Sequence, residues 1–98
     1  MNVRVGGSAG EELGEAVRWY EDQSEGLGVA FLEAVQKVIS RIETHPEIGA
    51  RLADQHHTRR VLVTGFPYQI VYIVRPTEAI VVAVAHLKRR PGYWRRPR

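Results

Sequence analysis

The feature that most constrains the fold of this chain is one change in the period of its hydrophobic pattern. Up to residue 45 the apolar side chains recur at helical spacing, and from residue 58 they recur at the spacing of strands. A helical part followed by a strand part is typical of an α+β domain, in which helices pack on a mostly antiparallel sheet. Because 98 residues suffice for one hydrophobic core, we expect a single domain that spans residues 1–98.

The helical part predicts two amphipathic helices joined in a hairpin. A short strand at residues 2–5 precedes them, and Ser8 with Glu11 forms a capping-box pattern that predicts the start of the first helix. This helix is expected to end near Ser24, and the second follows a glycine-rich break and stops before Pro46. The apolar face of the second helix comprises Phe31, Leu32, Val35, Val38, Ile39 and Ile42.

The strand part predicts three consecutive strands separated by turns that contain glycine or proline. We expect these strands at residues 60–63, 67–74 and 79–87. Residues 47–57 have no clear period and are expected to form a loop between the helices and the sheet. The predicted order is therefore β-α-α-β-β-β, an antiparallel helical hairpin packed on a mostly antiparallel sheet.

Charge is divided unevenly along the chain. Residues 1–57 carry five Lys or Arg against ten Asp or Glu, a net of −5, whereas residues 58–98 carry nine against one, a net of +8. The excess is densest in residues 88–98, a basic C-terminal extension that also contains Tyr93 and Trp94. Such a surface favours nucleic acid, an acidic partner protein or a second copy of the chain, although basic tails of this kind are often without function.

Several classes of protein are disfavoured by what the sequence lacks. The absence of cysteine removes disulfides and thiolate metal sites and fits a reducing compartment. No apolar run approaches the roughly 20 residues that span a bilayer, so we expect a cytoplasmic protein without membrane contact. The adjacent His56 and His57 have no further ligand nearby, and no nucleotide-binding glycine motif occurs. We therefore expect neither a metal nor a cofactor.

Five short strings follow one another along almost the whole chain. They are E-A-V-R-W-Y at 15–20, F-L-E-A-V at 31–35, I-x-x-H-P-E-I-G at 42–49, R-R-V-L-V-x-x-F-P-Y-Q-I-V-Y at 59–72 and A-V-A-H-x-x-R-R-P-G-Y-W at 83–94. In this order they resemble the ParE branch of the RelE/ParE superfamily, the toxin halves of bacterial type II toxin–antitoxin pairs, which include plasmid stabilisation systems. The resemblance implies a small α+β toxin that a cognate antitoxin, ParD-like or other, neutralises by wrapping its C-terminal segment around it.

The resemblance leaves two activities open, of which the first is ribonuclease activity. RelE-like members cleave messenger RNA in the ribosome, with basic residues ahead of the middle strands and an arginine near the C-terminus. Lys37 and Lys88 are the only lysines in this sequence, so the lysine pair of the ribonucleases is missing. In a variant site, a histidine would act as base or acid, arginines would hold the phosphate, and a tyrosine would lie near the leaving group. The residues for such a site are His57, His86, Arg60, Arg89, Arg90 and Tyr93.

The second activity is non-enzymatic. ParE-like members resemble inhibitors that bind DNA gyrase and trap it on cleaved DNA, which requires a binding surface rich in the Trp, Tyr and Arg that dominate binding energies. The missing lysine pair and the basic, aromatic extension favour this activity. The residues expected to face the target are His86, Lys88, Arg89, Arg90, Tyr93 and Trp94. The residues expected to bind the antitoxin are Trp19, Tyr20, Arg60 and Tyr68.

Two further alternatives remain, a nucleic-acid-binding or ribosome-binding module without catalysis and an inactive relic of a toxin. The six positive residues of the extension would support salt-sensitive binding of nucleic acid with Kd on the order of 10⁻⁴ to 10⁻⁶ M. No recognised nucleic-acid-binding motif accompanies them. Purely structural roles also remain open for His86, as a half-buried residue at a strand end, and for Trp19 and Tyr68, as core residues.

Overall fold

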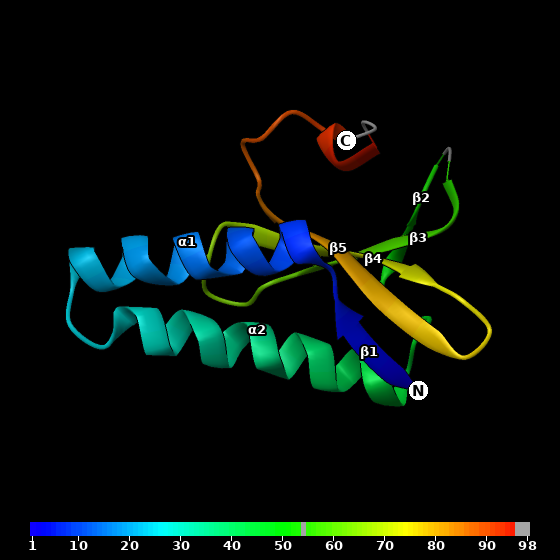
Figure 1. Ribbon diagram of the computed structural model, residues 1–98, viewed down its shortest axis with the longest axis horizontal. Coiled ribbons are helices and arrows are strands. Elements are labelled where there is room, and N and C mark those ends of the chain that lie inside the picture. The colour runs from blue at the N-terminus through cyan, green and yellow to red at the C-terminus, as the bar shows by residue number, and fades with distance from the viewer. Residues whose placement is uncertain (54, 96–98) are drawn as a thin grey trace.

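Two helices cover one face of a five-stranded sheet in this protein, whose computed structural model describes residues 1–53 and 55–95 (Figure 1). The helices run antiparallel to each other, and the predicted α+β fold class is confirmed. The elements are β1 (Asn2–Val5), α1 (Gly7–Gln23), α2 (Leu27–Thr44), β2 (Ala50–Leu52), β3 (Gln55–Leu62), β4 (Tyr68–Val74), β5 (Glu78–His86) and a 3₁₀ turn, η1 (Tyr93–Arg95).

The strands are ordered β1-β5-β4-β3-β2 across the sheet. Strand β1 runs parallel to β5, and the remaining neighbours are antiparallel. Because β1 is short, it pairs only with residues 78–81 of β5. In the described part of the chain, the second half of β5 therefore has a strand neighbour on one side only, and helix α1 lies along the other side (Figure 1).

Helix α1 begins at Gly7, so the prediction of a capping box at Ser8 is wrong. The N-cap residue is Gly6, and no side chain caps this helix. The Gly6 N–H extends the sheet by donating to the Val81 carbonyl oxygen at 2.9 Å, while the Gly6 carbonyl oxygen accepts from the Gly10 N–H at 2.8 Å. A Cβ at residue 6 would lie only 3.1 Å from the Val81 oxygen, which favours glycine. The sheet therefore fixes where the helix starts.

The turn between the helices is held by the carboxylate of Glu21. The N–H of Ser24 donates to the last turn of α1, so the predicted end of this helix is confirmed. Glu21 accepts hydrogen bonds from the N–H groups of Gly26 and Gly28, each at 3.0 Å. Gly26 adopts a φ of 88°, the left-handed conformation that glycine adopts at little cost. These contacts set the geometry with which α2 returns along α1.

The main core lies between the helical hairpin and the sheet. At its centre, the ring of Phe31 contacts the rings of Tyr20, Phe66 and Tyr68 at centroid distances of 4.9 to 5.1 Å. Tilted and edge-on contacts such as these are the preferred arrangements of aromatic pairs. The predicted apolar face of the second helix is confirmed. The buried residues of this core include Ala16, Tyr20, Phe31, Val35, Val38, Ile42, Ile70, Tyr72, Ala79, Val81 and Val84.

The prediction of a loop at residues 47–57 is wrong in part. The short strand β2 lies within this range, and β3 begins at Gln55 instead of residue 60. The first six of the eight residues of β3 are polar and read Q-H-H-T-R-R, so this part of the strand has no hydrophobic period. A strand near the edge of a sheet can carry such residues, because its backbone pairing rather than an apolar face keeps it in place.

A buried tyrosine fastens the segment that leads from α2 into the sheet. The Tyr72 hydroxyl donates to the Pro46 carbonyl oxygen at 2.8 Å and accepts from the Gly49 N–H at 2.9 Å. The Arg59 side chain adds two bonds, to the carbonyl oxygens of Glu47 at 3.0 Å and Gly49 at 2.8 Å. A Cβ on residue 49 would come within 2.7 Å of the Tyr72 hydroxyl. Glycine is therefore required for this close approach.

A β-bulge in β5 changes which residues face the helices. In the register with β4, Val71 pairs with Ala83 and Tyr72 pairs with Val81, so Val82 is an extra residue. Ala79 and Val81 face the helical core before the bulge, and Val84 faces it afterwards. On the other face, Ala83 and Ala85 pack with Val71. The bulge therefore brings His86 to the helix side, where an unbroken alternation would have put it on the opposite face.

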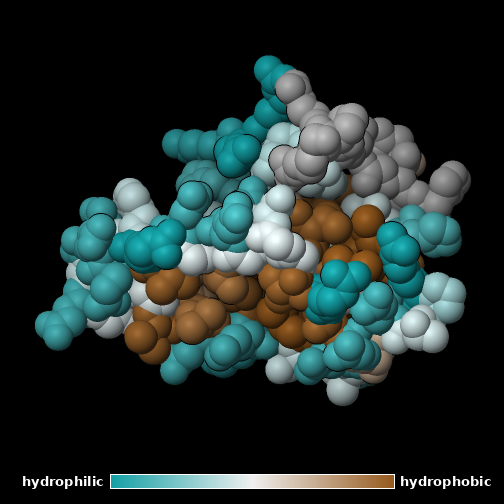
Figure 2. Space-filling view, in the orientation of Figure 1, coloured by the Kyte–Doolittle hydropathy of each residue, from teal (hydrophilic) through white to brown (hydrophobic). Residues whose placement is uncertain are grey.

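Apolar surface is visible on the face of the molecule shown in Figure 1, along the seam between α1 and α2 and beside β1 (Figure 2). Exposed hydrophobic side chains of the described residues include Val5 and Val29. The outer side of α1 is hydrophilic in the same view. No helix in the described part of the chain combines the length and the apolar character needed to cross a membrane.

Candidate functional site

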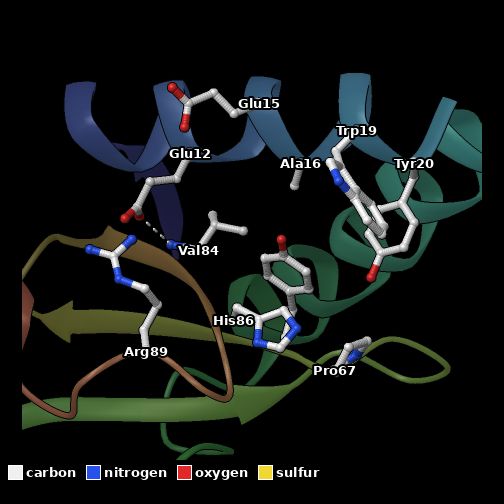
Figure 3. Close-up of a pocket in the computed structure, with 10 residues that line it drawn as sticks. Glu12, Glu15, Ala16, Trp19, Tyr20, Pro67, Val84, His86 and Arg89 are labelled. Carbon is white, nitrogen blue, oxygen red and sulfur yellow. Dashed lines mark hydrogen bonds between the residues drawn. The ribbon is translucent and has the colours of Figure 1, made fainter. Parts of the chain in front are cut away.

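A groove of about 540 Å³ lies between helix α1 and the end of strand β5 (Figure 3). One wall is formed by α1, which contributes residues at positions i, i+3, i+4, i+7 and i+8 and therefore on one face of the helix. The other wall comes from β4, β5 and the turns beside them. The residues of the helical wall are Glu12, Glu15, Ala16, Trp19 and Tyr20, and those of the opposite wall are Pro67, Tyr68, Val84, His86 and Arg89.

Aromatic rings line one end of this groove. Trp19 is 58% exposed, and its indole packs edge-on against the Tyr20 ring at a centroid distance of 5.1 Å. The ring of Tyr68 lies beside them and contacts His86, also at 5.1 Å. A tryptophan this exposed is unusual, and exposed aromatic side chains next to a groove are typical of protein-binding surfaces. The predicted antitoxin-binding residues Trp19, Tyr20 and Tyr68 are thus brought together.

The two phenols of the groove are poor bases. Burial raises the pKa of Tyr68 above the ordinary value of 10.0, and the nearby charge of Glu12 raises it further. Burial, followed by the charge of Tyr68, raises the pKa of Tyr20 in the same direction. Both hydroxyls therefore stay protonated at neutral pH and offer hydrogen bonds, not negative charge.

The other end of the groove carries charges of both signs. Glu12 and Glu15 project from α1, and His86 and Arg89 face them from the end of β5. The Arg89 side chain points toward the Glu12 carboxylate (Figure 3). The Nδ1 atom of His86 accepts the Lys88 N–H at 3.0 Å, which leaves the second ring nitrogen for a ligand. This end can therefore hold both an acidic and a basic group of a partner.

After β5 the chain crosses to the face of the sheet that the helices leave uncovered. Tyr93 and Trp94 pack there against a second small core, with their rings edge-on at 5.3 Å. Lys88, Arg89 and Arg90, which we call the basic segment, remain exposed. The residues of the second core are Val71, Ala83 and Ala85, with Leu52, Val82, Tyr93 and Trp94 packed around them.

Glu12 connects the groove to this C-terminal region. Its Oε1 atom accepts the backbone N–H of Val84 at 2.9 Å (Figure 3), and its Oε2 atom accepts the hydroxyl of Tyr93. Val84 lies in the half of β5 that β1 does not reach. Sequence reasoning missed Glu12, although its spacing from the buried Ala16 and Tyr20, i, i+4 and i+8, indicates the covered side of α1.

The candidates for a ribonuclease site are spread over both faces and both ends of the sheet. His86 pairs with Tyr68 at one end of β4, whereas His57 lies next to Thr58, the partner of Ile73 at the other end. At about 3.3 Å per residue, the two histidines are on the order of 15 to 20 Å apart. His57 lines a separate polar pocket of about 390 Å³ together with Arg51 and Arg59.

The remaining predicted residues are also separated between the two faces of the sheet. Arg60 pairs with Val71 and therefore faces the second core, opposite Trp19 and Tyr68. Tyr93 and Trp94 are half-buried, so only part of each ring is open to a target. Asp54, the side chain of His56 and residues 96–98 of the basic extension lie outside the described part. Within that part, no group of three or more metal-ligating side chains comes together.

Comparison with known proteins found one matching family model and similar solved structures. A family model described as the ParE toxin of the type II toxin–antitoxin system parDE matches residues 3–91. A solved structure titled "Chromosomal ParDE TA system from P. aeruginosa" is similar with a TM-score of 0.65 and 14% identity, covering 88% of this chain and 95% of that chain. At that identity the likeness shows a shared fold. No curated protein matches. The family match ends before Tyr93 and Trp94.

Proposed function

Because this chain belongs to the ParE family of toxins from type II toxin–antitoxin systems, we propose that it acts by binding DNA gyrase, without chemistry of its own. In this proposal the toxin acts in the bacterial cytoplasm, and a cognate antitoxin holds it inactive. Cleavage of messenger RNA on the ribosome is the alternative activity. A nucleic-acid-binding module without catalysis and an inactive relic are the remaining alternatives.

The observation that carries this proposal is the separation of the residues that could catalyse RNA cleavage. An acid and a base must both come within hydrogen-bond reach of one phosphodiester, at about 2.6 to 3.2 Å from the atoms they serve. His57 and His86 are at opposite ends of β4, and Arg60 faces away from both. A ribonuclease would therefore depend on His86, Tyr93 and the neighbouring Arg89 and Arg90, without the second histidine, which supports binding over catalysis.

The basic segment is the surface that we propose for the target. Three consecutive cations are exposed there, and the guanidinium carbon of Arg89 lies 3.9 Å from the centroid of the Tyr93 ring. Arginine held over an aromatic ring is partly preorganised for bidentate hydrogen bonds to acidic groups, such as carboxylates and phosphates. A gyrase–DNA complex presents both kinds of group. His86, Tyr93 and Trp94 would support this segment and contribute the exposed parts of their rings.

We propose the groove as the surface for the antitoxin. Trp19 supplies an exposed anchor, and Tyr20 and Tyr68 supply the apolar floor. His86 and Arg89 belong both to the groove and to the region of the basic segment, so an antitoxin seated in the groove would cover part of the target surface. Arg60 lies on the opposite face and would be reached only by a partner that wraps around the sheet.

Charge reversal tests the proposed target surface. We expect Arg89→Glu with Arg90→Glu to abolish inhibition of purified gyrase in a supercoiling assay, because the exposed cations that would meet the target become anions. The matched control is Arg41→Glu with Arg75→Glu, two exposed arginines outside this region, which should inhibit like the wild type. A translation-dependent messenger RNA cleavage assay runs beside it. Cleaved transcripts with unaffected supercoiling would contradict the gyrase proposal and support the ribonuclease.

A further inference from the structure

We infer that Glu12 is a positioning residue that holds the basic segment in its target-facing place. The inference rests on the proposed function for its biological consequence, whereas the contacts behind it involve this chain alone. The family match covers Glu12 but ends before Tyr93, the residue that Glu12 holds. The connection therefore joins the matched region to the part of the extension that lies beyond residue 91.

The first step is the pair of hydrogen bonds that Glu12 accepts. Its two carboxylate oxygens take donors that lie 72 and 81 residues further along the chain, the Val84 N–H and the Tyr93 hydroxyl. Hydrogen bonds to an ionised acceptor are about twice as strong as neutral ones. One carboxylate therefore ties helix α1 both to the unpaired side of β5 and to the C-terminal extension.

The second step leads from Tyr93 to the basic segment. The Arg89 guanidinium lies over the Tyr93 ring, with its Cζ atom 3.9 Å from the centroid. Tyr93 also packs edge-on against Trp94, whose indole rests on Val71, Ala83 and Ala85. Moving Tyr93 would remove the support beneath Arg89, so the place of the basic segment depends on the bond between Tyr93 and Glu12.

The third step is the thin cover on this face of the sheet. Trp94 and Tyr93 are half-buried, and the residues beneath them are mostly small. The buried indole N–H of Trp94 has no acceptor among the described residues, so it adds no polar bond to hold the extension. A segment with so few buried contacts opens more readily than the main core. Loss of the Glu12 bond should therefore loosen the extension without unfolding the domain.

The chain contains two tryptophans, which makes this inference directly measurable. In a Trp19→Phe background, Trp94 is the one remaining indole, and acrylamide quenching of its fluorescence reports its exposure. We expect Glu12→Gln to raise the quenching constant about two-fold, because an opened segment exposes the ring. Tyr93→Phe, which removes one oxygen atom, should give the same rise. The double variant should give no more than either single change, since both remove one interaction.

Glu15→Gln is the matched control for the test. Glu15 loses the same charge on the same wall of the groove, one turn further along α1, and should leave the quenching constant unchanged. Equal quenching in Glu12→Gln and Glu15→Gln, or additive effects of Glu12→Gln and Tyr93→Phe, would overturn the inference. Far-UV circular dichroism checks the fold. If Glu12→Gln unfolds the domain, the test rests on the quenching constant of Tyr93→Phe. An unchanged quenching constant in that variant would also overturn the inference.

A supercoiling assay on the same variants separates this inference from the proposed function. If the wild type inhibits gyrase, we expect Glu12→Gln to inhibit about ten-fold less, in line with the lower end of the range for the loss of one hydrogen bond to a charged group. Equal inhibition by a variant whose Trp94 is exposed would overturn the positioning role and leave the gyrase proposal intact. A wild type without effect on gyrase, combined with the predicted quenching pattern, would overturn the gyrase proposal and leave the role of Glu12 in place.

Discussion

The two faces of this sheet are covered in very different ways. The helical hairpin covers one face with a continuous core that includes the fully buried Phe31 and Tyr72. The other face carries small buried side chains, Ala83 and Ala85, beneath a single turn of chain that brings Trp94. The helix side therefore holds most of the hydrophobic core, and the second side carries the turn that follows the basic segment. Substitutions on the two faces should separate stability from activity.

The largest effect on stability is expected for Phe31→Ala. Phe31 is 0% exposed and contacts three other rings, so the truncation leaves a cavity at the centre of the core. Changes of this kind cost about 3 to 5 kcal/mol, a large part of the 5 to 15 kcal/mol that stabilises a typical domain. Urea unfolding followed by circular dichroism measures the loss. A cost below about 1 kcal/mol would show that the two faces do not differ as described.

Tyr72→Phe should have an intermediate effect. It removes the hydroxyl that donates to Pro46 and leaves the buried Gly49 N–H without this acceptor. An unsatisfied buried group costs about 1 to 3 kcal/mol of unfolding free energy, measured by urea titration at pH 7. Tyr68→Phe, on the same face of β4, is the control and should cost less, because Tyr68 lies at the open groove.

The Tyr72→Phe variant should also differ from the wild type in alkaline solution. Burial raises the pKa of Tyr72 above the unfolded value of 10.0, although the Gly49 N–H and Arg59 partly oppose this. The folded state then holds its proton more tightly, so the stabilisation is present below pH 10 and is lost as the pH rises through the folded pKa. The free energy of unfolding is measured between pH 9 and 11 for the wild type and Tyr72→Phe. If it falls equally steeply in both, the loss of stability in alkaline solution is due to other groups.

The smallest effect on stability is expected on the second face. Trp94→Ala should cost about 1 to 2 kcal/mol, because the ring is half-buried, yet it should weaken gyrase inhibition strongly by removing the support of the basic segment. Trp94→Phe should restore both, since the indole N–H has no acceptor in the described chain and its loss breaks no bond. Thermal unfolding and the supercoiling assay give the two readouts. Full inhibition by Trp94→Ala would make this turn irrelevant to activity.

The main elements of the fold could be predicted from the sequence because their side chains repeat with a clear period. Helix α1 and the strands β4 and β5 begin and end within a residue or two of the expected positions, and so does the end of α2. For the start of α2 the sequence predicted only a glycine-rich break. The start of β3 could not be predicted, since its polar residues give no hydrophobic period and are held by backbone pairing with β2 and β4. The capping box failed because the sheet, through Gly6, decides where α1 begins.

The candidate site was harder to predict than the fold. The aromatic group of Trp19, Tyr20 and Tyr68 could be chosen by residue type, and the structure brings these three together. Glu12 was missed because it bonds to groups more than 70 residues away, which no local pattern shows. Arg60 shares no surface with the aromatic group, since β3 turns its side chain to the second face.

The bulge at Val82 makes the site depend on the register of β5 in a way that substitution would not reveal. If Val82 paired with Val71 and the strand continued without the bulge, every later residue of β5 would change face. His86 would then point to the face now covered by Trp94, and the backbone N–H that Glu12 accepts would point elsewhere. A shift of one residue in the register of β5 would thus place its polar groups on the opposite face of the sheet, with every side chain preserved.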